Sequence, residues 1–184
     1  MKYTFTGGEL GERINKSIER LKSSEYCAPE IFIEKNDWPG DWEGRTLLAL
    51  CMNYQSTNDQ NQKAQIMSQM QDIVKGLDDV LNEHGYFGII FESGNANEQQ
   101  LSGNSWFLRA LCEYYNITND PKVMGILSNI IDNYLLKLAG YYSKYPVIAD
   151  REIGGVGGHL VSKNGTGWML SSDVGCAFIM LDGI

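Results

Sequence analysis

The feature that most restricts the fold of this chain is an internal repeat. Two stretches match at a constant spacing of 61 residues: Ala49-Leu50-Cys51 matches Ala110-Leu111-Cys112, Tyr54 matches Tyr115, and Thr57-Asn58-Asp59 matches Thr118-Asn119-Asp120. Self-similarity at a fixed spacing is typical of proteins built by repeating one structural unit. The sequence therefore predicts at least two copies of the same unit.

Each copy has the pattern of a helix buried on nearly every side, followed by an amphipathic helix with one solvent-exposed face. Residues 46–54 and 106–115 are apolar around nearly the whole helical wheel, with only Arg109 and Glu113 interrupting the second stretch. The following segments, 62–83 and 121–138, place apolar residues on one face: Ile66, Met70, Ile73, Leu77 and Leu81 in the first, and Val123, Ile126, Ile130, Tyr134 and Leu138 in the second. This alternation predicts inner and outer layers of helices, as in an αα-toroid or solenoid.

Capping residues suggest where the helices begin. Residues 9–24 form an amphipathic first helix, Asp41 is the expected N-cap of the second helix, and Ser102 is the expected N-cap of the helix in the stretch 98–120. Ser172-Asp173 precedes a third apolar helix, and residues 159–170 fit a β-hairpin turning at Asn164-Gly165. We expect one all-α domain over 1–184, with about three helical hairpins and this small β-hairpin.

Composition narrows the classes of partner. The formal net charge of −8, without a run of Lys or Arg, argues against nucleic acid and anionic membranes and favours a neutral or weakly charged ligand. Neither a signal peptide nor a membrane-spanning stretch is evident, so the chain as given is expected to be cytoplasmic. The four cysteines have no metal-binding spacing, so we expect reduced thiols, no metal and no cofactor.

The candidate site lies where long loops lead into the starts of the inner helices. All four tryptophans lie near these starts, and aromatic rings beside carboxylates and amides suit a sugar, although tryptophan as core filler is the competing explanation. The positive ends of the helix dipoles also favour oxygen-rich ligands there. The expected substrate-binding residues are Trp42, Trp106, Arg45, Gln99, Gln100, Asn104, Tyr86, His159 and Trp168.

The acids in the same region suggest glycoside cleavage, which requires one protonated and one ionised carboxyl group. The candidate catalytic residues are Glu98, Asp41, Glu43 and Asp173. Helix capping alone would explain Asp41 and Asp173. The distance between the two carboxyl groups would decide between a retaining and an inverting reaction. A lyase would instead need a base such as Tyr86 or His159.

Three segments also resemble a known superfamily: DWEGRTLLAL, EQQLSGNSWFLRALCEYY and GWMLSSDVGCAFIMLDG. They are similar to the N-terminal half of six-hairpin, (α/α)6-toroid glycoside hydrolases, in particular β-L-arabinofuranosidase-like members. The resemblance covers the chain from about Trp38 to the end and implies a pocket where inner helices and long loops meet. Those enzymes use a zinc-bound cysteine nucleophile from a region that is not matched here, so the resemblance assigns no catalytic residue.

Together these patterns predict a carbohydrate-processing protein of glycoside hydrolase type that makes up about half of a toroid. The alternatives are a non-catalytic helical scaffold or carbohydrate-binding module, and a polysaccharide lyase-like toroid. Because the third inner helix would lack an outer partner, its apolar residues Val174, Phe178, Ile179 and Leu181 predict a homo-oligomer formed through that end. A chain lacking half of its toroid is also expected to show little or no hydrolytic turnover.

Overall fold

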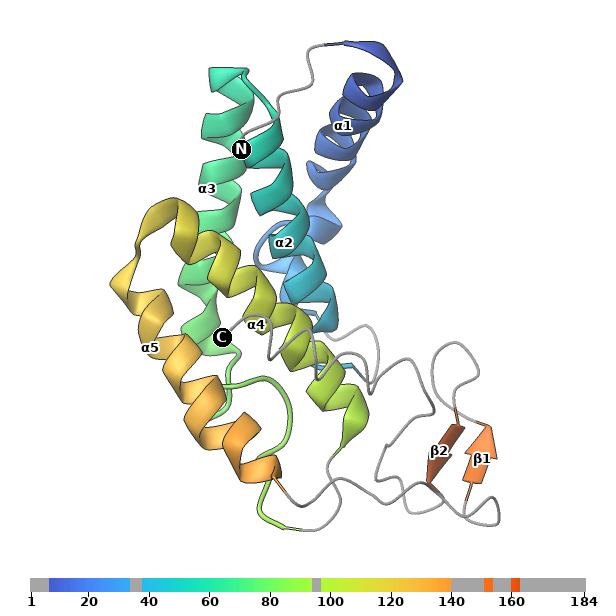
Figure 1. Cartoon of the computed structure of the whole chain (residues 1–184), viewed down its shortest axis with the longest axis vertical. Helices are drawn as coiled ribbons and strands as arrows, with labels where there is room; N and C mark the ends of the chain where they lie inside the picture. The colour runs from blue at the N-terminus through green and yellow to red at the C-terminus, as the bar shows by residue number, and fades with distance from the viewer. Residues whose placement is uncertain (1–6, 34–37, 94–96, 140–150, 154–159, 163–184) are drawn as a thin grey trace.

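A computed structural model of the chain describes residues 7–33, 38–93, 97–139, 151–153 and 160–162 (Figure 1). Within these ranges the body of the protein is all-α, with five α-helices, α1 to α5, and short 3-10 or π segments at their ends. The predicted all-α class is therefore confirmed. The predicted third inner helix, for which Ser172-Asp173 is the expected cap, falls outside the described residues.

The first helix, α1 (Gly8–Leu21), is amphipathic as the sequence predicted. Ile18 and Leu21 are buried in the core, whereas Leu10 at the beginning of the helix is 57% exposed. Two single-turn 3-10 helices, η1 (Ser24–Tyr26) and η2 (Glu30–Phe32), follow α1 and lead toward α2.

The internal repeat corresponds to two helical hairpins. The first consists of α2 (Asp41–Ser56) and α3 (Gln60–Gly76), which is extended by η3 (Leu77–Asp79). The second consists of α4 (Glu98–Thr118) and α5 (Pro121–Ile130), which is extended by the π-helical turn η4 (Ile131–Leu135) and by η5 (Leu136–Leu138). The first outer helix ends several residues earlier than the predicted boundary at residue 83.

The same hydrogen bonds form the turn in each hairpin, which explains why the Thr-Asn-Asp segment repeats. Thr57 Oγ1 accepts from the amide of Asp59 at 3.1 Å, and Thr118 Oγ1 accepts from the amide of Asp120 at 3.2 Å. Each aspartate is then the N-cap of its outer helix, accepting from amides of the first turn. The spacing of 61 residues therefore reflects a repeated turn as well as repeated helices.

The two hairpins pack through their inner helices, α2 and α4, which run in the same general direction while α3 and α5 run back (Figure 1). The backbones of α2 and α4 come very close at two glycines. A β carbon at Gly103 would overlap the carbonyl oxygen of Pro39, and one at Gly44 would overlap the backbone of Phe107. Glycine at these positions therefore sets the distance between the hairpins.

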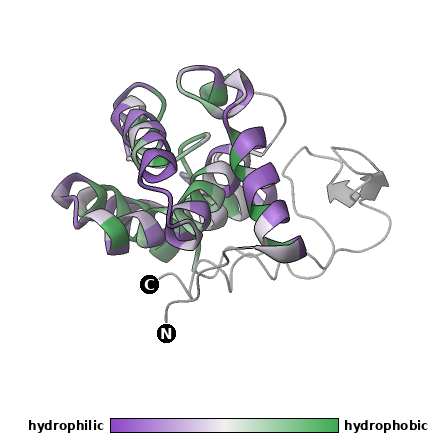
Figure 2. Cartoon of the chain, turned by 90° about the horizontal axis from the view of Figure 1, so that it is seen from above, coloured by the Kyte–Doolittle hydropathy of each residue, from purple (hydrophilic) through white to green (hydrophobic). Residues whose placement is uncertain are grey.

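The ribbons coloured by hydropathy show hydrophobic and hydrophilic residues alternating along the helices (Figure 2). The apolar faces predicted for the two outer helices lie in the core, although Leu81 is only half-buried. Among inner-helix residues, Leu47, Leu50, Phe107, Leu108 and Leu111 are fully buried or nearly so. Burial on nearly every side was predicted for 46–54 and 106–115, but α2 leaves Met52 exposed.

Two predicted N-caps are wrong. The cap of α2 is Gly40, which has a left-handed conformation with φ of 89°, and Asp41 is the first residue inside the helix. The cap of α4 is Asn97, whose side chain accepts from the amide of Gln100, so the helix begins five residues earlier than a Ser102 cap would require. Ser102 is instead a fully buried residue inside α4.

The described β structure is a two-stranded antiparallel ribbon of β1 (Arg151–Ile153) and β2 (Leu160–Ser162). Arg151 pairs with Ser162 and Ile153 pairs with Leu160. The predicted hairpin over 159–170 would pair the segment before Asn164-Gly165 with the segment after it, whereas the described partner of β2 is β1, which lies before it in the chain. The expected turn at Asn164-Gly165 lies outside the described residues.

Candidate functional site

The described candidate residues come from three segments that meet around the starts of α2 and α4. Helix α2 contributes Asp41, Trp42, Glu43 and Arg45; α4 contributes Gln99, Gln100, Asn104 and Trp106; and the loop between α3 and α4 contributes Tyr86. For Glu98, which begins α4, only the backbone is described. His159, Trp168 and Asp173 lie outside the described residues.

Asp41, Arg45 and Trp106 form one connected cluster, called here the Arg45 cluster. Arg45 Nε donates to both carboxylate oxygens of Asp41, at 2.9 Å each, one helical turn apart on α2. The guanidinium carbon of Arg45 lies 4.3 Å from the ring centroid of Trp106, within the usual range for a cation–π contact. The sequence placed these residues in one region, and the structure brings them into contact across the two inner helices.

The acids on α2 cannot serve as a facing catalytic pair. Asp41 and Glu43 are two residues apart on one helix, so their side chains point about 200° apart around its axis. Glu43 is only 9% exposed, whereas Asp41 pairs with the exposed Arg45. A two-carboxylate mechanism with either acid would thus need Glu98 or Asp173 as its second member.

Trp42 has a structural role that the sequence could not distinguish from sugar stacking. Its ring stacks on Tyr26, with centroids 5.1 Å apart and planes inclined by 19°, and its Nε1 donates to the carbonyl of Glu25 at 3.2 Å. These contacts fix η1 against the start of α2. The face of Trp42 toward Tyr26 is therefore occupied.

Gln100 and Asn104 bind the preceding loop rather than facing an open cleft. Asn104 is fully buried; its Oδ1 accepts from the amide of Phe87, and its Nδ2 donates to the carbonyl of the same residue, each at 3.0 Å. Gln100 Nε2 donates to the carbonyl of Ile89 at 2.8 Å. Both predicted ligand-binding amides thus fasten the loop to α4.

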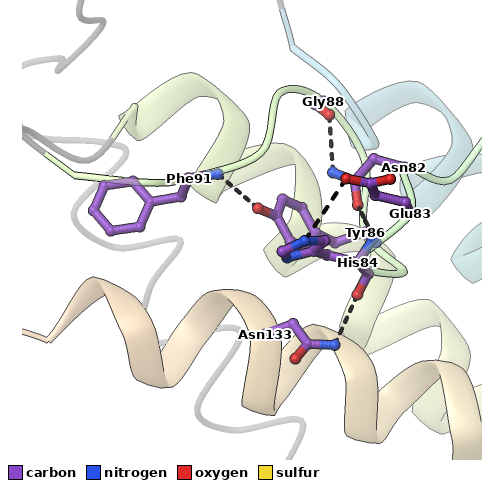
Figure 3. Close-up of polar contacts among 7 residues, drawn as sticks. All are labelled: Asn82, Glu83, His84, Tyr86, Gly88, Phe91 and Asn133. Atoms are coloured by element: carbon purple, nitrogen blue, oxygen red, sulfur yellow. Dashed lines mark hydrogen bonds and ion pairs between the residues drawn. The ribbon is translucent and has the colours of Figure 1, made fainter.

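The loop itself is held by Asn82 (Figure 3). Asn82 Oδ1 accepts from the amides of His84 and Tyr86, and its Nδ2 donates to the carbonyl of Gly88. From α5's extension, Asn133 donates to the carbonyl of His84 at 2.9 Å. A long loop before an inner helix is typical of a functional segment, and in this loop side-chain amides hold the backbone in place.

Tyr86 lies in the core. Its side chain is 0% exposed, its hydroxyl accepts from the amide of Phe91 at 2.7 Å, and its ring stacks on Tyr134 with centroids 4.5 Å apart. A general base must reach the proton that it removes. In this conformation Tyr86 reaches no solvent, so it does not support the lyase alternative.

The side-chain amide of Gln99 is buried at the start of α4. Gln99 is only 6% exposed, and its Nε2 is buried without a hydrogen-bond partner among the residues that the structure describes. A buried amide donor without a partner is costly and therefore uncommon. The sequence placed Gln99 among several polar residues, and no local pattern separated it from Gln100, whose amide is satisfied by the loop.

No group of three or more metal-ligating His, Cys, Asp or Glu side chains occurs within the described part of the chain. The described cysteines, Cys27, Cys51 and Cys112, are free thiols. Burial is the main cause that raises the pKa of all three, and nearby carboxylates raise it further, although at Cys112 the charge of Arg109 acts in the opposite direction. The pKa of Cys51 is raised to about 12. Such thiols remain protonated at neutral pH and are poor nucleophiles. Cys176 lies outside the described residues.

The raised pKa of Cys51 predicts loss of stability at alkaline pH. The unfolded thiol loses its proton near pH 9, whereas the folded thiol keeps it until about pH 12, so the stabilisation is complete below pH 9 and falls as pH rises. We expect the free energy of unfolding to fall by up to about 1.4 kcal/mol per pH unit more in the wild type than in Cys51→Val. Urea unfolding at pH 8, 9 and 10 would measure this, and equal slopes in both proteins would contradict it.

Clefts described elsewhere in the protein are separate from the Arg45 cluster. One, of about 420 Å³, lies between the end of α1 and α3 and includes Cys27, Gln69 and Asp72 in its lining. Another, of about 500 Å³, lies at the start of α1 and the α2–α3 turn, beside Glu12 and Asn58. Neither contains a residue that the sequence had singled out for binding.

No described helix combines the length and apolar character needed to cross a membrane. No protein-family model matches the chain, and no curated protein or solved structure matches it either.

Proposed function

We propose that this protein binds carbohydrate at the starts of its inner helices and processes it in the manner of a glycoside hydrolase. The observation that carries the proposal is the Arg45 cluster, in which a carboxylate, a guanidinium and an indole from two different helices are held together at a partly exposed position. This combination suits a sugar, because aromatic rings stack on the C–H faces of sugars and charged groups form hydrogen bonds with their hydroxyls. The (α/α)6-toroid architecture is part of the same proposal and is supported by the two stacked helical hairpins.

A non-catalytic helical scaffold or carbohydrate-binding module is the second candidate. It is favoured by the roles of Trp42, Gln100 and Asn104, which bind neighbouring backbone in the structure. Product analysis after incubation with a panel of glycosides would separate the two. Released sugar supports hydrolysis, and binding without turnover supports the binding module.

Substitution of Trp106 should weaken sugar binding more than substitution of Trp38. Trp106 lies inside α4 against Arg45, whereas Trp38 lies before α2. We expect Trp106→Ala to lower affinity about tenfold in calorimetric titration, because it removes both the indole and the support of Arg45. Loss of the ring should also cost on the order of 3 kcal/mol of stability. Binding must therefore be compared under conditions in which both variants are folded, and equal affinities there would contradict the stacking role.

A further inference from the structure

We propose that the ligand of the Arg45 cluster carries a carboxylate, so that the substrate class is an acidic sugar such as a uronic acid. This inference rests on the proposed function, because it names the substrate class of the same site. It also departs from the neutral or weakly charged ligand that net charge alone favoured. The reason is the way in which Arg45 is held.

Arg45 uses only one edge of its guanidinium group within the protein. Its Nε donates to Asp41, and its guanidinium carbon lies over the ring of Trp106. Its terminal Nη1 and Nη2 groups have no hydrogen-bond or ion-pair partner within the described part of the chain. The side chain is 53% exposed, so these donors remain accessible.

Two terminal amino groups of one guanidinium are a fixed fork that matches the two oxygens of a carboxylate. Contacts with Asp41 and Trp106 restrict the side chain before any ligand arrives. Less conformational entropy is then lost on binding than for a flexible arginine. A neutral sugar could accept from one of these donors, but it could not occupy both with paired charged bonds.

Gln99 is a second side chain with a donor from which no described residue accepts a hydrogen bond. It lies seven residues before Trp106 on α4, which is two helical turns away on the same face. Its Nε2 has no hydrogen-bond partner among the described residues, and because this atom is buried, a ligand oxygen would reach it only after the side chain turned outward. Two turns correspond to roughly 10 Å along the helix, a span that suits an oligosaccharide better than a single small anion.

The preference for an acidic sugar over a neutral one is expected to be moderate, because the charges of the cluster nearly cancel. Asp41 and Arg45 offset each other, so the cluster has little excess positive charge to attract an anion. The preference must come from the bidentate geometry, helped by the positive end of the α2 dipole one turn away. We expect an acidic sugar to bind about tenfold more tightly than its neutral counterpart, which is within the usual range for hydrogen bonds to charged groups.

Calorimetric titration of the full chain with matched pairs of oligosaccharides would test the proposal. The pairs are oligogalacturonate with oligogalactose and oligoglucuronate with oligoglucose, with acetate as a carboxylate that lacks a sugar. The variants are Arg45→Gln, which removes the charge, and Arg45→Lys, which keeps the charge but loses the fork. Arg13→Gln is the matched control, because Arg13 also pairs with an acid one turn away, Glu9, on the exposed surface of α1.

The expected result is tighter binding of the acidic member of each pair, with the preference lost in Arg45→Gln, largely lost in Arg45→Lys and unchanged in Arg13→Gln. Equal affinities for acidic and neutral sugars would overturn the acidic substrate class and leave the proposed function standing. Binding of acetate as tight as that of the uronates would overturn the assignment to a sugar. Absence of binding to every sugar would overturn the proposed function together with this inference.

Discussion

Gly103→Ala is expected to destabilise the protein by about 3 kcal/mol or more, which is a large part of the stability of a domain of this size. The added methyl group would overlap the carbonyl oxygen of Pro39 and would come within 3.0 Å of the amide nitrogen of Asp41. These are backbone atoms, so no rotamer change can relieve the overlap. The start of α2 would have to move away from α4.

Gly44→Ala should have a similar effect, because its methyl group would meet the backbone of α4 at Phe107. Gly125→Ala provides a matched control inside another helix. Nothing lies within 4 Å of the position that its β carbon would take, so alanine there should stabilise the protein by about 0.5–1 kcal/mol through helix propensity.

Urea unfolding of the three variants would measure these differences. A loss in Gly103→Ala and Gly44→Ala that is no larger than about 1 kcal/mol would show that α2 and α4 are not in close backbone contact.

The sequence allowed the helical hairpins to be predicted because their signals are local or periodic. The repeated Thr-Asn-Asp turn and the apolar faces of α3 and α5 follow directly from residue spacing. Helix starts were harder to predict, because Asn97 and Ser102 are both good capping residues and only the backbone conformation selects between them. The glycines between α2 and α4 gave no signal either, since a lone glycine in a helical pattern only lowers helix propensity.

The candidate site was predictable in composition but not in contacts. Residues near helix starts could be grouped from the sequence, and Asp41, Arg45 and Trp106 do meet. The sequence did not indicate that Gln100 and Asn104 bind a loop, because those contacts join residues 11 and 17 positions apart and depend on how the loop folds back. It also gave no reason to separate Gln99 from these neighbours.

Asn104→Leu is expected to lower the free energy of unfolding by about 3–5 kcal/mol, because it removes the central contact between α4 and the loop. Leucine has a similar size, so the main effect is on hydrogen bonding. Both the amide and the carbonyl of Phe87 would lose their partner while Phe87 remains 5% exposed, and each buried unsatisfied group costs about 1–3 kcal/mol.

Asn133→Leu is the control for this experiment, since Asn133 holds the same loop from the other side through a single, half-buried hydrogen bond to His84. Its loss should cost only about 1 kcal/mol. Urea unfolding would give both values, and amide hydrogen exchange at Phe87 would show whether the loop opens before the helices do, because local opening exposes amides at a lower free energy than global unfolding. If Asn104→Leu and Asn133→Leu cost the same, or if Phe87 remains as protected as in the wild type, the amide of Asn104 does not hold the loop. The structure predicts the opposite: faster exchange at Phe87 in Asn104→Leu, with exchange in the middle of α3 following only the change in global stability.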